Sequence, residues 1–183
     1  MTSLIDSLKE CEAIKFGDFT LASGKKSKYY IDIKKASASP RILKHIAHEI
    51  SEKIKLHSIG ADYIGCVALG GVPVAVAVSL EMDMPLIIIR KEAKEYGTKG
   101  QVVGDFIRNS TVLMVEDVAT TGGSVLKAIR LLKDEGLKIN HVIVVVDREE
   151  GAKKALEDEG VELIALVRIG ELLQGNAASS GYR

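Results

Sequence analysis

The sequence predicts an α/β fold, in which a central parallel sheet is flanked by helices and preceded by a small N-terminal unit. From residue 63 onward, short apolar runs rich in β-branched residues alternate with segments of helical periodicity. The runs are apolar throughout, which is typical of strands covered on both faces. The length of 183 residues, with 46% hydrophobic and 27% charged side chains, suits one globular domain. We therefore expect a single domain over 1–183, with residues 1–38 mostly in the N-terminal unit and 39–175 in the core.

The N-terminal unit has its own pattern. We expect a helix near 3–14 and then two short strands within 18–33, on either side of a Ser-Gly-Lys-Lys turn. A long helix over about 39–57 begins at Ser39 and Pro40, an N-cap residue followed by proline at the first helical position.

The core elements follow one another in strict alternation. The expected strands span 63–67, 85–90, 111–115, 141–146 and 162–167. The helices expected between them span 72–82, 124–136 and 149–160. Alternation of this kind predicts right-handed crossovers between parallel strands.

Residues 91–109 interrupt this order. They lie between two predicted strands, lack clear periodicity and hold three glycines and three lysines. Because long irregular loops in compact domains are usually functional, we interpret this segment as a candidate active-site loop.

Composition excludes several classes of protein. The 25 basic and 25 acidic residues cancel, so a general affinity for nucleic acid is not indicated. Cys11 and Cys66 lie far apart and have no partners at metal-ligand spacing, which favours two reduced thiols. The N-terminus lacks the apolar centre of a signal peptide, and the apolar runs are too short to span a membrane. We therefore expect a cytoplasmic protein without a nucleic-acid or membrane partner.

A candidate anion site follows the strand predicted at 111–115. The sequence TVLMVEDVATTGGSVL, residues 111–126, runs from that strand through Glu116 and Asp117 into a small-residue loop and a helix. Free N–H groups at a helix start favour a phosphate, and hydroxyl side chains add donors. The pattern matches neither a P-loop nor a dinucleotide-binding fingerprint.

The carboxylates beside this loop indicate a phosphorylated sugar. The phosphate would lie in the loop, while Glu116 and Asp117 accept hydrogen bonds from ribose hydroxyls. The same carboxylates would favour positive charge that develops on the sugar ring, which makes Asp117 a catalytic candidate.

The residues VLMVEDVATTGGS resemble the phosphoribosyl-pyrophosphate (PRPP) binding motif of type I phosphoribosyltransferases. The resemblance implies that family's fold and a set of residues that bind PRPP through the motif. These are Glu116, Asp117, Val118, Ala119, Thr120, Thr121, Gly122, Gly123 and Ser124.

Three further stretches resemble the orotate branch of this family. Residues 19–32 are similar to its N-terminal substrate hood, 90–104 to its mobile catalytic loop, and 144–152 to the strand end that contacts the base. The resemblance implies transfer of the ribosyl 5-phosphate group from PRPP to orotate N1, which yields orotidine 5′-phosphate and pyrophosphate for UMP synthesis. The alternatives are transfer to another base and a non-catalytic PRPP-sensing regulator.

The resemblance also implies roles for individual residues. Arg148 and Thr120 would bind orotate, since arginine offers a rigid fork to planar acceptors. Arg90, Lys91 and Lys94 would bind PRPP and meet the departing pyrophosphate, with Lys94 as the main catalytic lysine.

The same resemblance implies a homodimer in which loop 90–104 reaches the neighbouring subunit's site. Magnesium would arrive with PRPP, so no direct protein ligation of the metal is expected.

The chain departs from many bacterial members at three places. Tyr96 stands where those members have histidine, and Ala22 and Gly70 stand where they have lysine. Lys25 and Lys26 are the nearby hood lysines, and the sequence assigns them no role.

Overall fold

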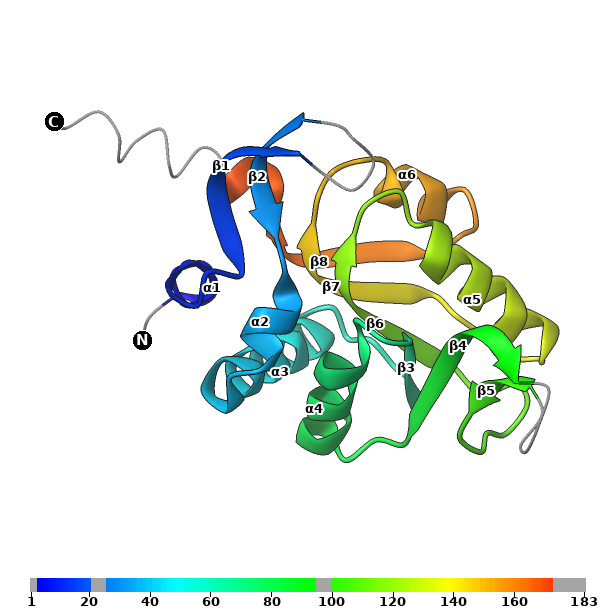
Figure 1. Ribbon diagram of the computed structural model, residues 1–183. Coiled ribbons are helices and arrows are strands. Elements are labelled where there is room, and N and C mark those ends of the chain that lie inside the picture. The colour runs from blue at the N-terminus through cyan, green and yellow to red at the C-terminus, as the bar shows by residue number, and fades with distance from the viewer. Residues whose placement is uncertain (1–2, 21–25, 95–99, 173–183) are drawn as a thin grey trace, which may run out of the picture.

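The computed structural model describes residues 3–20, 26–94 and 100–172, without the side chains of residues 93 and 94. Figure 1 shows helices packed on both sides of a twisted sheet, as the sequence predicts. The helices are α1 (Leu4–Glu10), α2 (Ile33–Ser37), α3 (Pro40–Leu56), α4 (Val72–Met82), α5 (Gly123–Asp134) and α6 (Ala152–Glu157). The strands are β1 (Ile14–Thr20), β2 (Lys26–Ile31), β3 (Tyr63–Val67), β4 (Leu86–Lys94), β5 (Gly100–Val103), β6 (Val112–Ala119), β7 (His141–Asp147) and β8 (Glu162–Arg168).

The main sheet has the strand order β5-β4-β3-β6-β7-β8. Neighbouring strands from β4 to β8 are parallel, and β5 pairs antiparallel with β4 at one edge. The predicted central parallel sheet is therefore confirmed. The chain runs outward from β3 to β4, and then from β6 to β8 in the opposite direction. Helices that cover strands laid down in opposite directions fall on opposite faces, because each crossover is right-handed.

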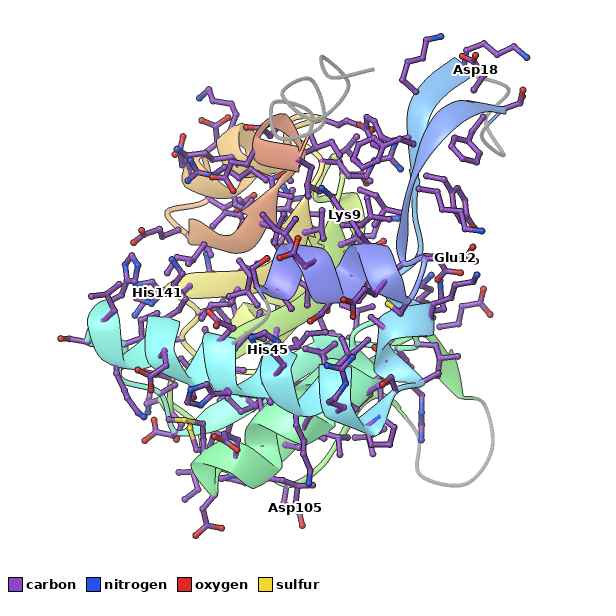
Figure 2. All side chains as sticks on the ribbon, turned by 90° about the vertical axis from the view of Figure 1, so that its left-hand side faces the viewer. Lys9, Glu12, Asp18, His45, Asp105 and His141 are labelled. Atoms are coloured by element: carbon purple, nitrogen blue, oxygen red, sulfur yellow. The ribbon has the colours of Figure 1, made fainter. Side chains whose placement is uncertain are left out.

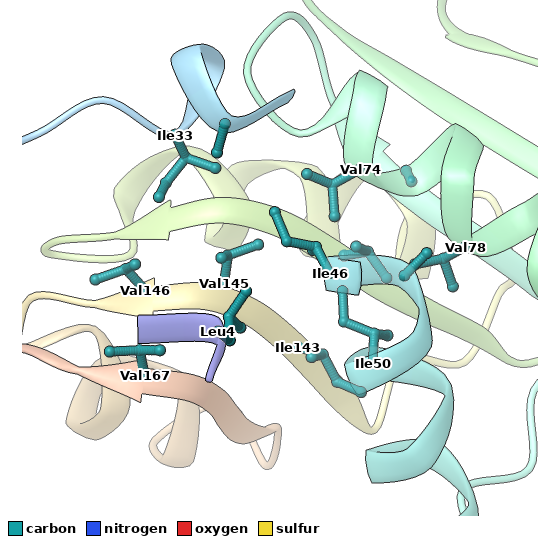
Figure 3. Packing of buried hydrophobic residues seen from close by; sticks show 14 of the residues in the cluster. Leu4, Ile33, Ile46, Ile50, Val74, Val78, Ile143, Val145, Val146 and Val167 are labelled. Carbon is teal, nitrogen blue, oxygen red and sulfur yellow. The ribbon is translucent and has the colours of Figure 1, made fainter. Parts of the chain in front are cut away.

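Two hydrophobic clusters fill the space between the sheet and its helices. One lies under α1, α3 and α4, and includes Ile46, Ile50 and Val78 packed against Ile143 and Val145 (Figure 3). The other lies under α5 and α6 on the opposite face. The buried face of α5 consists of Val125, Ala128, Ile129 and Leu132. None of the helices in the described part of the chain is both long and apolar enough to cross a membrane.

Strands β1 and β2 form a separate antiparallel sheet at the N-terminus, which we call the hood. Figure 2 shows the hood extending away from the helices, with Asp18 near its outer end. The hood returns to the core at Ile14 and Ile31, which pair with each other. The short α2 follows directly, and Asp32 caps its N-terminus by accepting a hydrogen bond from the N–H of Lys34.

Several sequence-based boundaries were wrong. The helix expected over 3–14 ends at Glu10, because the chain turns at Glu12, which has a φ of 56°. Strand β1 therefore begins at Ile14, before the region predicted for the hood strands. The helix expected over 149–160 covers only 152–157. The short α2 was not predicted.

The segment 91–109 is more regular than predicted. Strand β4 continues through Lys94, and β5 pairs with it through Ile88 and Val103. A four-residue edge strand has too few positions for its periodicity to be recognised. Residues 95–99 lie outside the described part of the chain.

Candidate functional site

The candidate site lies where the strand order of the sheet reverses. Strands β3 and β6 are neighbours, yet their following helices α4 and α5 cover opposite faces. Crevices at the carboxyl ends of such a strand pair are the usual ligand sites of open α/β sheets. Here, the backbone N–H of Val67 at the end of β3 donates to Oε1 of Glu116 on β6, at a distance of 2.6 Å. The predicted acidic pair therefore lies at the reversal point.

Two glycines of the β3–α4 loop contact the acidic pair. A Cβ atom placed on Gly70 would lie 2.4 Å from Oδ2 of Asp117, and one placed on Gly71 would lie 2.9 Å from Oε2 of Glu116. Real Cβ atoms do not approach other atoms so closely. The loop can therefore lie against both carboxylates only because these positions lack side chains. A side chain at Gly70 would displace Asp117.

The two carboxylates have different surroundings. Oδ1 of Asp117 accepts a hydrogen bond from the N–H of Val118 at 2.9 Å. The pKa of Glu116 is raised from its ordinary 4.5 to about 8, chiefly by burial. The negative charge of Asp117 also raises this pKa, whereas the hydrogen bond from Val67 and the charge of Lys91 lower it. Glu116 is therefore mostly protonated at neutral pH in the ligand-free protein. The two adjacent acids then do not carry two full charges.

The loop after β6, where the sequence predicts an anion site, leads directly into α5. Gly122 is the N-cap of α5 with a φ of 80°, and no side chain caps the helix. A Cβ atom placed on Gly122 would lie 3.4 Å from Cα of Ala152, so the loop also packs closely against α6. Thr121, Gly123 and Ser124 are exposed at the helix start. An uncapped helix start with exposed hydroxyl groups is suited to a phosphate.

A cavity of about 350 Å³ opens at this loop. Its lining contains eight of the nine predicted motif residues, namely Glu116, Val118, Ala119, Thr120, Thr121, Gly122, Gly123 and Ser124. The ninth, Asp117, points to the other side of β6, toward Gly70. The structure therefore brings the whole motif together around the end of one strand.

A second cavity of about 330 Å³ lies beside the first, between α5 and the β4–β5 pair. Arg90 and Lys91 line it, together with Lys127, and Ser124 and Lys127 line both cavities. No acidic side chain is among the described residues that line the second cavity. The surroundings therefore suit an anion that extends from the loop toward β4.

The predicted lysines of the hood and of the loop after β4 lie at the edges of the described ranges. Lys94 is the last residue of β4 and pairs with Gly100, but its side chain is outside the description. Lys25 and Tyr96 also lie outside the described residues. Lys26 is described: its Nζ donates to Oγ1 of Thr20 within the hood at 2.8 Å.

Arg148 lies directly after β7, beside the same loop. Its backbone N–H donates to the carbonyl of Ala119 at 2.9 Å, which places it next to Thr120. Its side chain is only 14% exposed, and Nη2 pairs with Oε1 of Glu150 at 2.7 Å. The guanidinium also lies over the ring of Tyr29 in the hood, 5.3 Å from the ring centroid. Arg148 therefore joins the hood to the candidate site.

Several residues at the site were not predicted. Val67, Gly71 and Lys127 contact or line it, and Tyr29 and Glu150 contact Arg148. Lys127 follows Ser124 by one helical turn, so helical spacing alone places it near the loop. The contacts of Val67 and Tyr29 join distant parts of the chain, and one sequence carries no signal for them.

The described residues contain no group of three or more histidine, cysteine, aspartate or glutamate side chains that could hold a metal ion. Asp117 nevertheless offers a carboxylate oxygen, which is the donor type that magnesium prefers.

Comparison with known proteins gives one consistent result. The sequence model of the phosphoribosyl transferase domain matches residues 32–164. An orotate phosphoribosyltransferase of Methanosarcina mazei is 53% identical over 171 residues, which cover 93% of this chain and 90% of the relative. The crystal structure of orotate phosphoribosyltransferase from Aeropyrum pernix has a TM-score of 0.86 at 33% identity, covering 96% of this chain and 98% of that one. The structure of Leishmania donovani UMP synthase has a TM-score of 0.83 at 32% identity. That match covers 98% of this chain and 39% of the UMP synthase chain.

Proposed function

The chain belongs to the orotate phosphoribosyltransferases of the phosphoribosyl transferase family, and we propose that its own residues carry out the reaction of that family as follows. The ribosyl 5-phosphate group of PRPP passes to N1 of orotate, with release of orotidine 5′-phosphate and pyrophosphate. The bond from the ribose C1 to pyrophosphate breaks with its electron pair leaving on pyrophosphate, a bond from C1 to N1 forms, and the proton of N1 passes to the departing pyrophosphate or to water. This is a step of UMP synthesis.

The observation that carries the proposal is the meeting of the acidic pair, the uncapped start of α5 and Arg148 at the end of β6. The 5-phosphate of PRPP would accept hydrogen bonds from the loop Thr120–Ser124. The ribose hydroxyls would donate to Asp117 and Glu116, and the carboxylate of Asp117 would stabilise positive charge on the ribose ring.

Pyrophosphate would extend toward the cationic cavity of Arg90 and Lys91. Its charge grows as the bond to C1 breaks, so cations that meet it lower the barrier. We assign Lys94 to the same task as the main catalytic lysine. Its place at the end of β4, beyond Arg90 and Lys91, supports this assignment.

Orotate would lie between Thr120 and Arg148. Orotate is planar and carries a carboxylate, and a guanidinium offers planar donors with a fixed charge. The low exposure of Arg148 favours a strong interaction, because water competes poorly there.

Magnesium would enter with PRPP and supply positive charge to the pyrophosphate oxygens. Asp117 would hold the metal complex through its carboxylate oxygen or through a metal-bound water. The donor type fits this ion, which keeps several waters and uses substrate oxygens.

We also propose a homodimer in which part of the loop 90–104 reaches the partner's site. An apolar groove of about 320 Å³ between α3 and α4 supports a subunit interface. Leu43, Ala47 and Val76 line it, and Leu80 is 79% exposed beside them. Light scattering should give twice the 19.7 kDa mass of one chain, and a monomer would contradict this proposal.

Loop sharing has its own test. Mixed K94A and D117A subunits should regain about a quarter of the wild-type activity, since random pairing makes half the dimers mixed, each with one intact site of two. No recovery would place Lys94 and Asp117 in the same subunit's site.

The free thiols of Cys11 and Cys66 support a reducing, cytoplasmic location.

The function itself is tested with purified protein, PRPP and magnesium. Orotate absorbance is followed in the ultraviolet, with hypoxanthine, adenine and uracil assayed in parallel. PRPP-dependent loss of orotate alone is the expected result. Turnover of a different base would transfer the assignment to another phosphoribosyltransferase, and PRPP binding without any turnover would favour a sensor.

A further inference from the structure

The hood and the core meet at one polar contact beside the site. Tyr29 on β2 lies under the guanidinium of Arg148, with 5.3 Å between Cζ and the ring centroid. A cation within about 6 Å of an aromatic ring face is attracted by the charge distribution of the ring. Because Arg148 is mostly buried, water weakens this attraction little.

The remaining contacts of Arg148 leave part of its guanidinium unused. Glu150 accepts from Nη2 at 2.7 Å. Nε is buried and has no hydrogen-bond partner among the described residues. A buried donor without a partner is costly and marks a place where a ligand acceptor or a rearrangement completes the site. The ring of Tyr29 and the carboxylate of Glu150 are therefore two contacts that restrict the position of the guanidinium.

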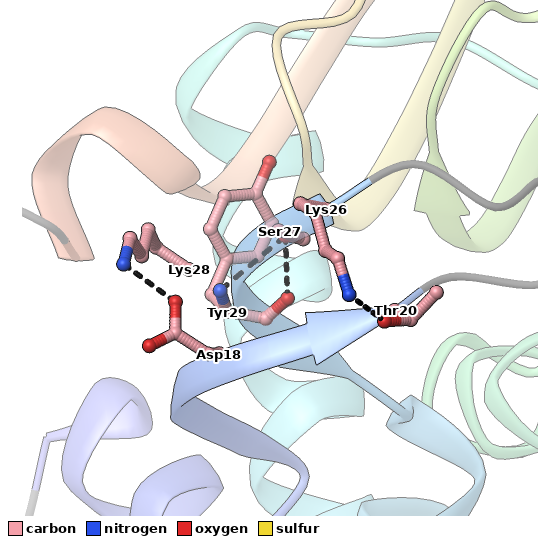
Figure 4. A network of polar contacts seen from close by, with 6 residues as sticks. All are labelled: Asp18, Thr20, Lys26, Ser27, Lys28 and Tyr29. Atoms are coloured by element: carbon pink, nitrogen blue, oxygen red, sulfur yellow. Dashed lines mark hydrogen bonds and ion pairs between the residues drawn. The ribbon is translucent and has the colours of Figure 1, made fainter.

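Tyr29 is itself held firmly in the hood. The hydroxyl of Ser27 donates to the carbonyl of Tyr29 at 2.7 Å and accepts from its N–H at 3.3 Å (Figure 4). Tyr29 also pairs with Phe16 across the hood. The neighbouring Tyr30 points to the opposite face, is 42% exposed, and contacts the ring of Phe19. Of the two adjacent tyrosines, only Tyr29 faces Arg148, as the alternation of a strand requires.

We propose that Tyr29 is a positioning residue for orotate, acting through Arg148. Through this cation–π contact, Tyr29 holds the guanidinium so that its free donors face the planar, anionic base. This inference rests on the proposed function, because it takes Arg148 to be the residue that binds orotate. If Tyr29 has this role, recognition of the base depends on the position of the hood. Binding of PRPP by the loop at the start of α5 does not depend on Tyr29.

The test compares three single variants in steady-state kinetics. Y29L removes the aromatic face, Y29F keeps it, and Y30L is the matched control on the opposite face of the same strand. Loss of the cation–π contact should raise the KM for orotate about threefold to tenfold in Y29L. The KM for PRPP should change less than about twofold, since Tyr29 is not among the described residues that line the cavity at the PRPP loop. Y29F should restore the wild-type KM for orotate, and Y30L should leave it unchanged.

A double variant separates positioning from a general effect on hood folding. If Tyr29 acts through Arg148, adding Y29L to R148A should produce no further rise in the KM for orotate. An unchanged KM in Y29L, an equal rise for both substrates, or an additive effect in the double variant would overturn the role of Tyr29. Those results would leave the proposed function intact if the wild type consumes orotate. Absence of orotate turnover by the wild type would overturn both.

Discussion

Replacing Glu116 with glutamine is expected to remove a pH dependence from the free energy of unfolding. Glu116 is buried at the junction of β3 and β6 and accepts the N–H of Val67. Its pKa is raised from 4.5 to about 8 in the folded protein, chiefly by burial. The folded state therefore holds a proton on this side chain that the unfolded state releases.

The direction of the effect follows from this difference in bound protons. Between pH 4.5 and about 8 the folded state binds more protons than the unfolded state, so stability falls as pH rises. The stability that Glu116 contributes is fully present below pH 4.5, the pKa of the unfolded state, and is lost once the pH exceeds about 8, the pKa of the folded state. The slope is about 1.4 kcal/mol per pH unit for one proton, and the loss accumulates to on the order of 5 kcal/mol over the interval. Two nearby charges also act on the folded-state pKa of Glu116: the charge of Asp117 raises it, and the charge of Lys91 lowers it.

Urea unfolding of wild type and E116Q at several pH values between 5 and 9 measures this quantity. Far-ultraviolet circular dichroism is suitable because the chain has no tryptophan. Glutamine can accept the same N–H of Val67, so subtracting the two profiles leaves the titration of Glu116. We expect the wild type to lose stability relative to E116Q up to about pH 8 and then level off. E157Q removes an exposed carboxylate from α6 and should follow the wild type. Parallel profiles of wild type and E116Q would refute a buried, protonated Glu116.

Two further substitutions test the loops around the acidic pair. K94A should lower turnover about a hundredfold through loss of transition-state stabilisation, while PRPP still binds; unchanged turnover would remove Lys94 from the catalytic groups. G70A introduces a Cβ that would lie 2.4 Å from Oδ2 of Asp117, so this carboxylate must move. We expect G70A to reduce kcat/KM for PRPP by about tenfold or more, because Asp117 loses its productive position, with little change in thermal unfolding. Wild-type kinetics in G70A would show that Asp117 does not need its observed position.

The sequence predicted those features that depend on local patterns. The strand at 141–146 and the helix at 72–82 were placed almost without error, because a continuous apolar run marks each of them. The strand expected over 111–115 continues through Ala119, since Glu116 still pairs with Val144 on β7. The end of an apolar run therefore marked the start of the site rather than the end of strand pairing.

Contacts between distant segments were beyond the reach of a single sequence. The bond from Val67 to Glu116 joins residues 49 positions apart. The raised pKa of Glu116 comes from burial, against this hydrogen bond, and no local pattern reveals it. The contact of Tyr29 with Arg148 likewise needs the hood to fold toward the end of β7. The order of the motif predicted which residues lie together, whereas the pKa of Glu116 and the orientation of Arg148 depend on tertiary packing.

The measurement that tests the central claim most directly is the steady-state kinetics of R148A. Loss of a charge-assisted hydrogen-bonding group should cost about 1.5–3 kcal/mol, which corresponds to a rise of roughly tenfold to a hundredfold in the KM for orotate. The KM for PRPP should change less than about twofold, because its phosphate is held by the loop Thr120–Ser124. Equal changes in both constants, or an unchanged KM for orotate, would contradict the assignment of Arg148 to the base and with it the arrangement of the two substrates.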